Sequence, residues 1–223
     1  MNQSAPASFV YDPPREPFLT VLHADADLLV VDKPSGLLSV PGKALEHSDC
    51  IEARAQQTYP EARIVHRLDM DTSGVMVLAM NAQAHRHLGL QFERRKTEKT
   101  YVAEVWGQIE KDAGEIDLPL ICDWPNRPKQ MVSFEHGKPA LTRWQVIARN
   151  ERTTRVRLFP FTGRSHQLRV HMLSLGHPIV GDRFYATGDA LSVSPRLRLH
   201  AKSLTLHHQT GGERVKFDAF CEF

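Results

Sequence analysis

The stretch His66-Arg67-Leu68-Asp69-Met70-Asp71-Thr72-Ser73-Gly74 sets a carboxylate beside a His-Arg pair and directly before a turn rich in hydroxyl groups. Because a nearby cation favours the charged form of a carboxyl group, Asp69 is predicted to stay ionised. An ionised carboxylate is what nucleophilic catalysis by an acidic side chain requires. The alternative is that Asp69 and residues 72–74 only form a turn, as Asp, Ser and Gly often do.

Read as His-Arg-Leu-Asp-x-x-Thr-Ser-Gly, this stretch resembles the catalytic motif of the RluA family of RNA pseudouridine synthases. Four more segments resemble motifs of that family in the same order and spacing, and the likeness extends from Phe18 to Phe223. They are residues 31–37 (Val-Asp-Lys-Pro-Ser-Gly-Leu, with Asp32 where Asn is commoner), 99–103 (Lys-Thr-Tyr-Val-Ala), 162–171 (Thr-Gly-Arg-Ser-His-Gln-Leu-Arg-Val-His) and 177–182 (His-Pro-Ile-Val-Gly-Asp). A single short motif is weak evidence, whereas five in order indicate a family.

Strand-like runs dominate the chain without a regular alternation of strand and helix. They cover residues 18–22, 28–31, 75–80, 101–106, 141–148, 155–159, 198–200 and 203–206. This pattern favours an α+β fold with a mostly antiparallel sheet. The resemblance implies the pseudouridine synthase catalytic fold, in which a long mixed sheet with flanking helices bends around a central cleft.

Three helices are predicted between the strands. The first is expected to begin at a capping box formed by Asp49 and Glu52 and to end at Pro60. Asn81 is expected to cap the second helix, and the third is expected to run over residues 165–176, where a glycine ends it. The predicted buried stripe of the third helix consists of Leu168, Met172 and Leu175.

The expected organisation is a flexible arm over residues 1–17, which contain Pro and Ser but no apolar periodicity, followed by a single catalytic domain over residues 18–223. Some members of the family carry an additional N-terminal RNA-binding module of the S4 type. Because there is no room for such a module before Phe18, the chain resembles the short, catalytic-domain-only members.

The composition is that of a soluble globular protein, with 41% hydrophobic and 24% charged residues among 223. No apolar run approaches the roughly 20 residues that span a bilayer, and the first residues lack the features of a signal peptide. A cytoplasmic protein without membrane association is therefore expected. The three cysteines are odd in number and far apart, so they indicate neither a disulfide framework nor a zinc site.

The net charge of +2 is too small to indicate nucleic-acid binding by itself, so the distribution of the cations matters more. Local clusters occur at residues 94–96, 149–157 and 196–202. Each is either a site for phosphate or an ordinary solvated surface.

The resemblance implies that Asp69 is the catalytic carboxylate, which either attacks the sugar or removes a ribose proton. It implies no cofactor, metal or external water, because the uracil that leaves the ribose carries its own negative charge and is rejoined to it. Arg169 is expected to hold Asp69 bidentately. Tyr101 is expected to stack on the uracil and to help remove the C5 proton. Asp71, whose place in the motif is variable, is assigned to the turn.

The target uridine lies in folded RNA and must be flipped out of its stack. Arg67, with a planar guanidinium, is expected to fill the vacated space. Further side chains are expected to line the cleft or to contact RNA: Lys33, His66, Arg164, His166 and His171.

Residues 38–42 and the Pro-rich segment 118–130 resemble the short family members that modify both 23S rRNA and a tRNA anticodon stem-loop. Use of two substrates fits recognition by induced RNA shape and splayed bases. The expected partner is therefore RNA, and the protein is expected to act as a monomer.

Two functions of other classes stay open at this stage. A metal-dependent hydrolase could be built from His66, Asp69, His166 and His171, although no HExxH motif supports it. A non-catalytic RNA-binding or RNA-remodelling protein could use the same cleft. The combination of Asp69, Tyr101 and Arg169 argues against that second alternative, because binding anionic RNA does not need an ionised acid.

Overall fold

The computed structural model describes residues 10–223, in which ten strands form one curved sheet. Eight of them follow the order β1-β2-β4-β11-β5-β10-β9-β6, while β12 pairs with β11 and β3 with β4. Their bounds are β1 Thr20–Ala24, β2 Leu28–Lys33, β3 Arg63–Ile64, β4 Ser73–Ala79, β5 Glu98–Trp106, β6 Ala113–Asp117, β9 Leu141–Arg149, β10 Thr153–Pro160, β11 Leu199–His207 and β12 Arg214–Asp218.

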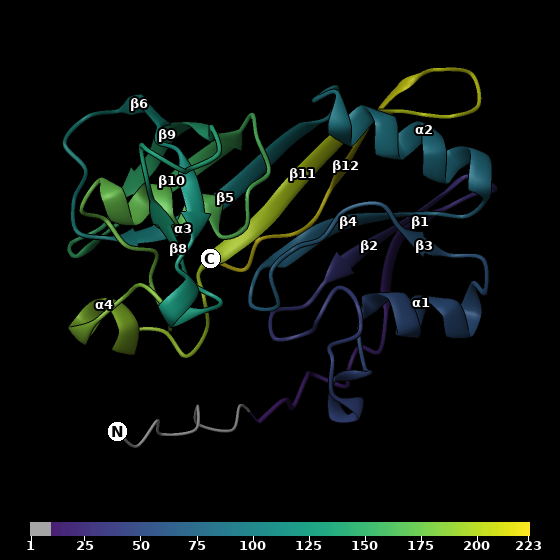
Figure 1. Ribbon diagram of the computed structural model, residues 1–223, viewed down its shortest axis with the longest axis horizontal. Helices are drawn as coiled ribbons and strands as arrows, with labels where there is room; N and C mark the ends of the chain where they lie inside the picture. The colour runs from purple at the N-terminus through teal and green to yellow at the C-terminus, as the bar shows by residue number, and fades with distance from the viewer. Residues whose placement is uncertain (1–9) are drawn as a thin grey trace.

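The sheet has two halves, each with its own helices (Figure 1). The helices α1 (Ile51–Thr58) and α2 (Ala82–Glu93) lie with β1 to β4, whereas α3 (Gln167–Ser174) and α4 (Gly188–Ser192) lie with β6, β9 and β10. The strands β5, β11 and β12 run between the two halves. A short 3-10 helix, η1 (Leu45–His47), precedes α1.

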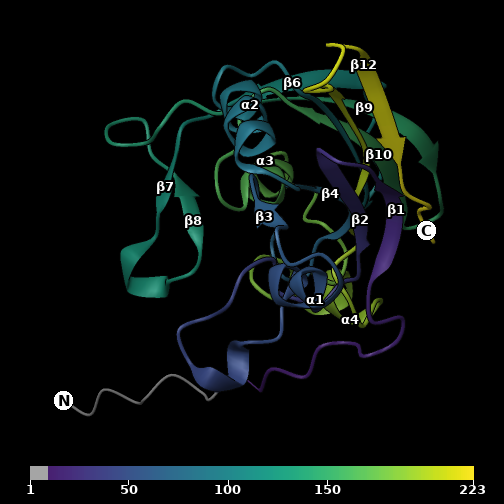
Figure 2. The ribbon, with the colours of Figure 1, turned by 90° about the vertical axis from the view of Figure 1, so that its right-hand side faces the viewer.

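A separate two-stranded hairpin, β7 (Leu120–Cys122) and β8 (Gln130–Val132), stands off from the body in Figure 2. The 3-10 helix η2 (Trp124–Asn126) lies between its strands. None of the helices in residues 10–223 combines the length and apolar character that crossing a bilayer requires.

The apolar runs of β2 and β4 follow from burial on both faces, as in strands that helices cover on each side. Val30 and Val77 belong to the core under α2, whereas Val31 and Met76 belong to the core under α1. A third core joins β5 and β10 to Leu168 and Met172 of α3. The structure thus has the predicted α+β architecture with a mixed, mostly antiparallel sheet.

The two halves meet at the short parallel pairing of β4 and β11, where Ser73 is opposite His200 and Gly74 opposite Ala201. Beyond this point β11 pairs with β12 instead. Gly74 makes the close approach possible, because a Cβ there would lie 2.2 Å from the backbone oxygen of Ala201, and its φ of +113° strongly favours glycine. The halves therefore join directly through this short parallel pairing, and β12 takes the place of β4 beside the rest of β11.

The helix predictions are partly correct. The Asn81 side chain caps α2 by accepting a hydrogen bond from the Ala84 amide at 2.8 Å. The predicted capping box at Asp49 is wrong, because the N-cap of α1 is Cys50 and the Asp49 carboxylate pairs with Arg54 at 2.7 Å. Leu175 is also predicted wrongly as buried, since 37% of its surface is exposed beyond the end of α3.

The predicted strands all occur, and residues 198–200 and 203–206 belong to the single strand β11. Five strands were not predicted: β3, β6, β7, β8 and β12. The described part of the predicted flexible arm is anchored, because the Tyr11 hydroxyl donates to the backbone oxygen of Asp49 at 2.7 Å and Arg54 donates to that of Pro14 at 2.8 Å. Residues 1–9 of the predicted arm lie outside the described residues.

We expect Gly74→Ala to destabilise the protein by more than about 2 kcal/mol, because the new Cβ meets backbone at a φ that L residues avoid. The matched control is Gly89→Ala in the interior of α2, where a Cβ would meet nothing within 4 Å. That change should leave stability unchanged or raise it by about 0.5–1 kcal/mol. Urea unfolding measures both, and equal effects would contradict the proposed close contact of β4 and β11.

Candidate active site

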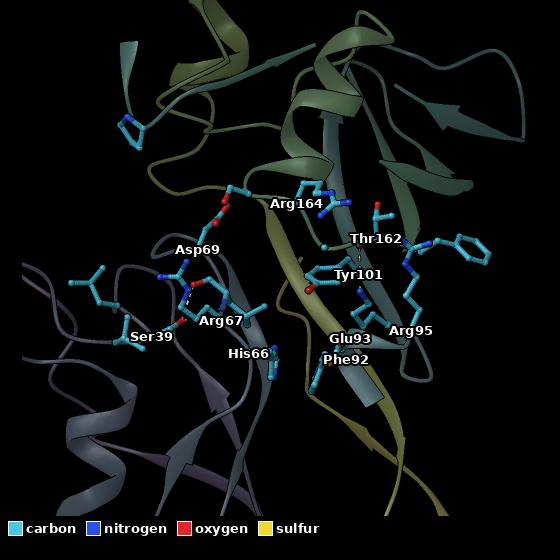
Figure 3. Close-up of a pocket in the computed structure, with 18 residues that line it drawn as sticks. Ser39, His66, Arg67, Asp69, Phe92, Glu93, Arg95, Tyr101, Thr162 and Arg164 are labelled. Carbon is cyan, nitrogen blue, oxygen red and sulfur yellow. Dashed lines mark hydrogen bonds between the residues drawn. The ribbon is translucent and has the colours of Figure 1, made fainter. Parts of the chain in front are cut away.

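Asp69 lies in the loop between β3 and β4, and its backbone is fixed on both sides. The Thr72 amide donates to the backbone oxygen of Asp69 at 3.1 Å. The Ser39 hydroxyl donates to the backbone oxygen of Leu68 at 2.7 Å and accepts from the Leu68 amide at 3.1 Å. The fold therefore sets the direction of the Asp69 side chain, which points into the space between the two halves (Figure 3).

Arg169 on α3 reaches Asp69 from the other half of the sheet. Its Nη1 lies 3.4 Å from Oδ2 of Asp69. Its Nε and Nη2 bind the two carboxylate oxygens of Asp182 at 2.7 and 2.6 Å, and both side chains of that pair are buried. The predicted bidentate hold on Asp69 is therefore wrong, because Asp182 receives the two parallel bonds and Asp69 one long contact.

His166 is the second neighbour of Asp69. Its Nε2 lies 3.9 Å from Oδ2 of Asp69, and its backbone has a φ of +52° at the N-cap of α3. The Tyr185 hydroxyl accepts from the Gln130 amide at 2.8 Å and lies 2.7 Å from Nδ1 of His166, to which it can donate. This favours the tautomer whose Nε2–H faces Asp69. Burial lowers the pKa of His166 more than Asp69 raises it, so the ring is neutral.

Tyr101 on β5 presents its ring to the same space. Within residues 10–223 its hydroxyl has no hydrogen-bond partner. Burial, and next the charge of Asp69, raise the pKa of Tyr101, so the phenol stays protonated at neutral pH. The ring and the free hydroxyl are therefore both available to a bound molecule.

A cavity of about 750 Å³ lies between these groups and is lined from both halves, by Asp69, Arg67 and His66 on one side and by Lys99, Tyr101 and Arg164 on the other. A smaller cavity of about 110 Å³ adjoins Asp69 and Tyr101 and reaches His166 and Arg169. Arg67 is exposed, lines both cavities, and makes no hydrogen bond or ion pair with the described residues. The predicted residues Asp69, Tyr101, Arg169, Arg67, Arg164 and His166 thus converge on one cleft.

Comparison with known proteins decides the family. Residues 27–174 match the family model described as RNA pseudouridylate synthase. The chain is 55% identical over 214 residues to the dual-specificity RNA pseudouridine synthase RluA of Escherichia coli K12, which covers 96% of this chain and 98% of that protein. It is 56% identical over 207 residues to the protein of the same name from Vibrio parahaemolyticus, covering 91% and 83%.

The chain belongs to the RluA family of RNA pseudouridine synthases. Solved structures agree: human RNA pseudouridylate synthase domain containing 1 superposes with a TM-score of 0.75 at 28% identity, covering 90% of this chain and 82% of that one. Human RNA pseudouridylate synthase domain containing 4 gives 0.72 at 26%, covering 91% and 88%. The protein is therefore an isomerase that acts on RNA, with the pseudouridine synthase fold.

Lys33 does not lie in the cleft of this pseudouridine synthase. It is fully buried, and its Nζ donates to the backbone oxygens of Pro34, Leu37 and Met70 at 2.9, 2.7 and 2.8 Å. Burial lowers the pKa of Lys33 to about 7, although Asp71 and then Asp69 raise it. The prediction that Lys33 contacts RNA is wrong, because the ammonium instead ties the segment after β2 to the loop that carries Asp69.

His171 is also misassigned as a cleft residue. It is fully buried, with Nδ1 2.9 Å from the Thr142 hydroxyl and Nε2 3.1 Å from the backbone oxygen of Leu118. His66 lines the cavity, but its Nε2 accepts from the Val77 amide at 3.1 Å and its ring stacks on Phe92. Burial, and then Lys99, lower the pKa of His66 to about 3, so it forms a neutral wall.

The four residues of the possible metal hydrolase are therefore not gathered. Across the described part of the chain, no group of three or more His, Cys, Asp or Glu side chains has the geometry to hold a metal ion.

Sequence reasoning missed the residues that support the site. Asp182 and Tyr185 hold Arg169 and His166, and Arg183 pairs with Asp71 at 3.0 Å. Asp182 lies inside a motif that was recognised, but no role was assigned to it. A signal for it exists, because a buried arginine requires a buried acid and the segment after the α3 glycine supplies one.

We expect Asp182→Asn to destabilise the protein by about 3–5 kcal/mol, because it leaves the buried Arg169 without its main counter-charge. The control is Asp112→Asn, whose exposed ion pair with Arg149 is worth at most about 1 kcal/mol. Both values come from urea unfolding. A loss below about 1 kcal/mol for Asp182→Asn would show that Arg169 does not depend on this pair.

Proposed function

We propose that this enzyme converts specific uridines of folded RNA to pseudouridine with Asp69 as the nucleophile. One observation carries the proposal: Asp69 lines both cavities at the point where they adjoin. Arg169, His166 and Tyr101 surround it there. Asp71, the other candidate acid, has its carboxylate 3.0 Å from Arg183. That pairing supports a role in holding the loop.

In the proposed reaction the Asp69 carboxylate bonds to C1′ of the ribose while the bond from C1′ to N1 of uracil breaks. The electron pair of that bond goes to the uracil ring, which turns within the cavity. C5 then bonds to C1′ and displaces Asp69, the C5 proton is removed, and N1 takes up a proton. One carboxylate suffices, in contrast to the pair that hydrolyses most glycosides, because the base carries its own charge and is not released.

The neighbours of Asp69 suit this reaction. Arg169 places a positive charge beside the carboxylate, while the single contact at 3.4 Å leaves Asp69 free to move toward C1′. The Tyr101 ring suits stacking on uracil, and its free hydroxyl suits proton transfer at C5. The cavity keeps the cleaved base close to the sugar. The base can therefore rejoin the sugar without being released into solution and bound again.

The proposed substrates are 23S rRNA and a tRNA anticodon stem-loop. Relatives that are 55–56% identical to this chain carry the name dual-specificity RNA pseudouridine synthase RluA. The segment 118–130 supports the proposal, since it contains β7 and the turn that leads to β8, exposes Trp124, and adjoins the large cavity through Pro128. We further propose that the protein acts as a monomer in the cytoplasm and that it flips the target uridine out of the RNA.

Asp69→Asn should lower turnover about 10⁴-fold or more, because it removes the nucleophile while keeping its size. RNA affinity should stay near that of the wild type or rise, since a negative charge leaves the cleft. Asp71→Asn is the matched control and should retain most of the activity. Release of tritium from C5-labelled uridine in a stem-loop RNA measures turnover. Equal losses in the two variants would refute the assignment, and an active Asp69→Asn variant would refute the mechanism.

Arg67→Ala tests base flipping. Because stacking contacts with bases are worth roughly 1–3 kcal/mol, loss of the guanidinium should slow modification of a structured stem-loop about ten-fold or more. On a short unstructured RNA, in which little stacking is broken, the defect should be much smaller. Arg63→Ala is the control, as Arg63 is exposed on β3 and pairs with Glu61. Equal defects of Arg67→Ala on both RNAs would exclude the flipping role.

A further inference from the structure

Three cations of the large cavity have no part in the mechanism above: Arg95, Lys99 and Arg164. Arg95 and Arg164 lie on the Tyr101 side of the cavity, opposite Arg67 and Asp69, in the view of Figure 3. No carboxylate among residues 10–223 forms an ion pair with any of the three. The wall beside Tyr101 therefore carries three cations without an ion-pair partner in the described part of the chain, with Glu93 as the carboxylate of the lining nearby.

Lys99 is the most unusual of these cations because it is largely covered. Within residues 10–223 its Nζ makes one hydrogen bond, a long one to the backbone oxygen of Thr162 at 3.4 Å. Burial, and then the charge of Arg95, lower the pKa of Lys99 to about 8. A covered ammonium without a counter-ion is unfavourable, which indicates a site that an anion completes.

Arg95 occupies a strained backbone position. It follows the end of α2 with a φ of +56°, the left-handed conformation in which glycine is favoured. The Lys96 amide donates to the backbone oxygen of Gln91 at 2.8 Å, which closes the helix end around Arg95. Strain of this kind is typical of functional sites. The hydrogen bond of Lys96 accounts for this backbone conformation, and the Arg95 side chain lines the cavity without an acidic partner among residues 10–223.

We propose that Arg95, Lys99 and Arg164 form a subsite for one phosphodiester of the RNA strand, next to the uridine that enters the cleft beside Tyr101. The proposal rests on the proposed function, which places the uracil against Tyr101. A phosphodiester is the anion that an RNA strand brings to this wall, and such contacts fix the position of the strand without reading its sequence. By holding this phosphodiester, the subsite fixes how far the RNA backbone lies from the flipped base.

The subsite has a pH dependence of definite sign. Lys99 binds a phosphate only as the ammonium ion, so RNA affinity should fall as the pH rises from 7 to 9. The charged and titratable groups around Lys99 are His66, Glu93, Arg95, Tyr101 and Arg164, with Asp69 across the cavity. The ring of His66 is neutral and the phenol of Tyr101 protonated throughout this range. Lys33, whose pKa burial lowers to about 7, lies buried outside the cavity, so a decline between pH 7 and 9 is assigned to Lys99 when Lys99→Arg removes it.

The test measures binding of a stem-loop RNA to full-length Asp69→Asn protein, so that affinity is separated from turnover. Adding Lys99→Met should weaken binding about ten-fold and reduce the slope of log K against log salt by about 1. Lys99→Arg should keep the affinity and remove its decline above pH 8. Arg94→Ala is the matched control, since Arg94 is the exposed neighbour of Arg95 that does not line the cavity.

Two further measurements separate the subsite from a structural role. Arg95→Gly should stabilise the protein against urea, because it relieves the positive φ, and should nevertheless weaken RNA binding. A second measurement uses a series of RNAs, in each of which a different single phosphate is replaced by a neutral methylphosphonate. For one RNA of the series, Lys99→Met should cause no further loss of binding affinity. A Lys99→Met penalty that is the same on every such RNA, or an unchanged salt slope, overturns the proposal. An active Asp69→Asn protein refutes the proposed function instead.

Discussion

The site depends on one buried guanidinium that lies between two carboxylates. Arg169 is almost fully buried, so its charge must be neutralised inside the protein. Asp182 does so with two short bonds of 2.7 and 2.6 Å, which leaves Nη1 directed at Asp69 from 3.4 Å. Because Asp182 supplies the main counter-charge, Asp69 faces a positive charge without being locked in a tight pair. The same guanidinium connects α3 with the loop before β4, and so joins the two halves of the sheet.

The sheet supplies the space that this chemistry needs. The close contact of Gly74 with Ala201 holds β4 against β11 just behind the loop of Asp69. Alternation along β5 turns Tyr101 toward the cavity, and the neighbouring Val102 to the opposite face. Lys33 holds the Asp69 loop in place, because its ammonium group donates a hydrogen bond to the backbone oxygen of Met70. The Asp69 carboxylate is thus positioned mainly by backbone contacts, while the other half of the molecule contributes the charges around it.

The sequence motifs predict where the chemistry lies better than they predict what each residue does. Asp69, Tyr101 and Arg169 converge on one cleft, as expected. Lys33 and His171 belong to the same motifs, but both are fully buried and stabilise the fold. Charged residues are seldom fully buried, so the sequence alone does not indicate that these two would be. Cys50 replaces Asp49 as helix cap, because Asp49 is used by Arg54. Strands of two or three residues, such as β3 and β7, are too short to show a period.

The most direct test of the account is a map of pseudouridine in total RNA from cells that lack this gene. The map is repeated after the gene is restored as wild type, as Asp69→Asn or as Asp71→Asn. The account predicts that specific pseudouridines in ribosomal and transfer RNA disappear with the gene and return with the wild type and Asp71→Asn but not with Asp69→Asn. Their return with Asp69→Asn, or a map that does not change when the gene is removed, would contradict it.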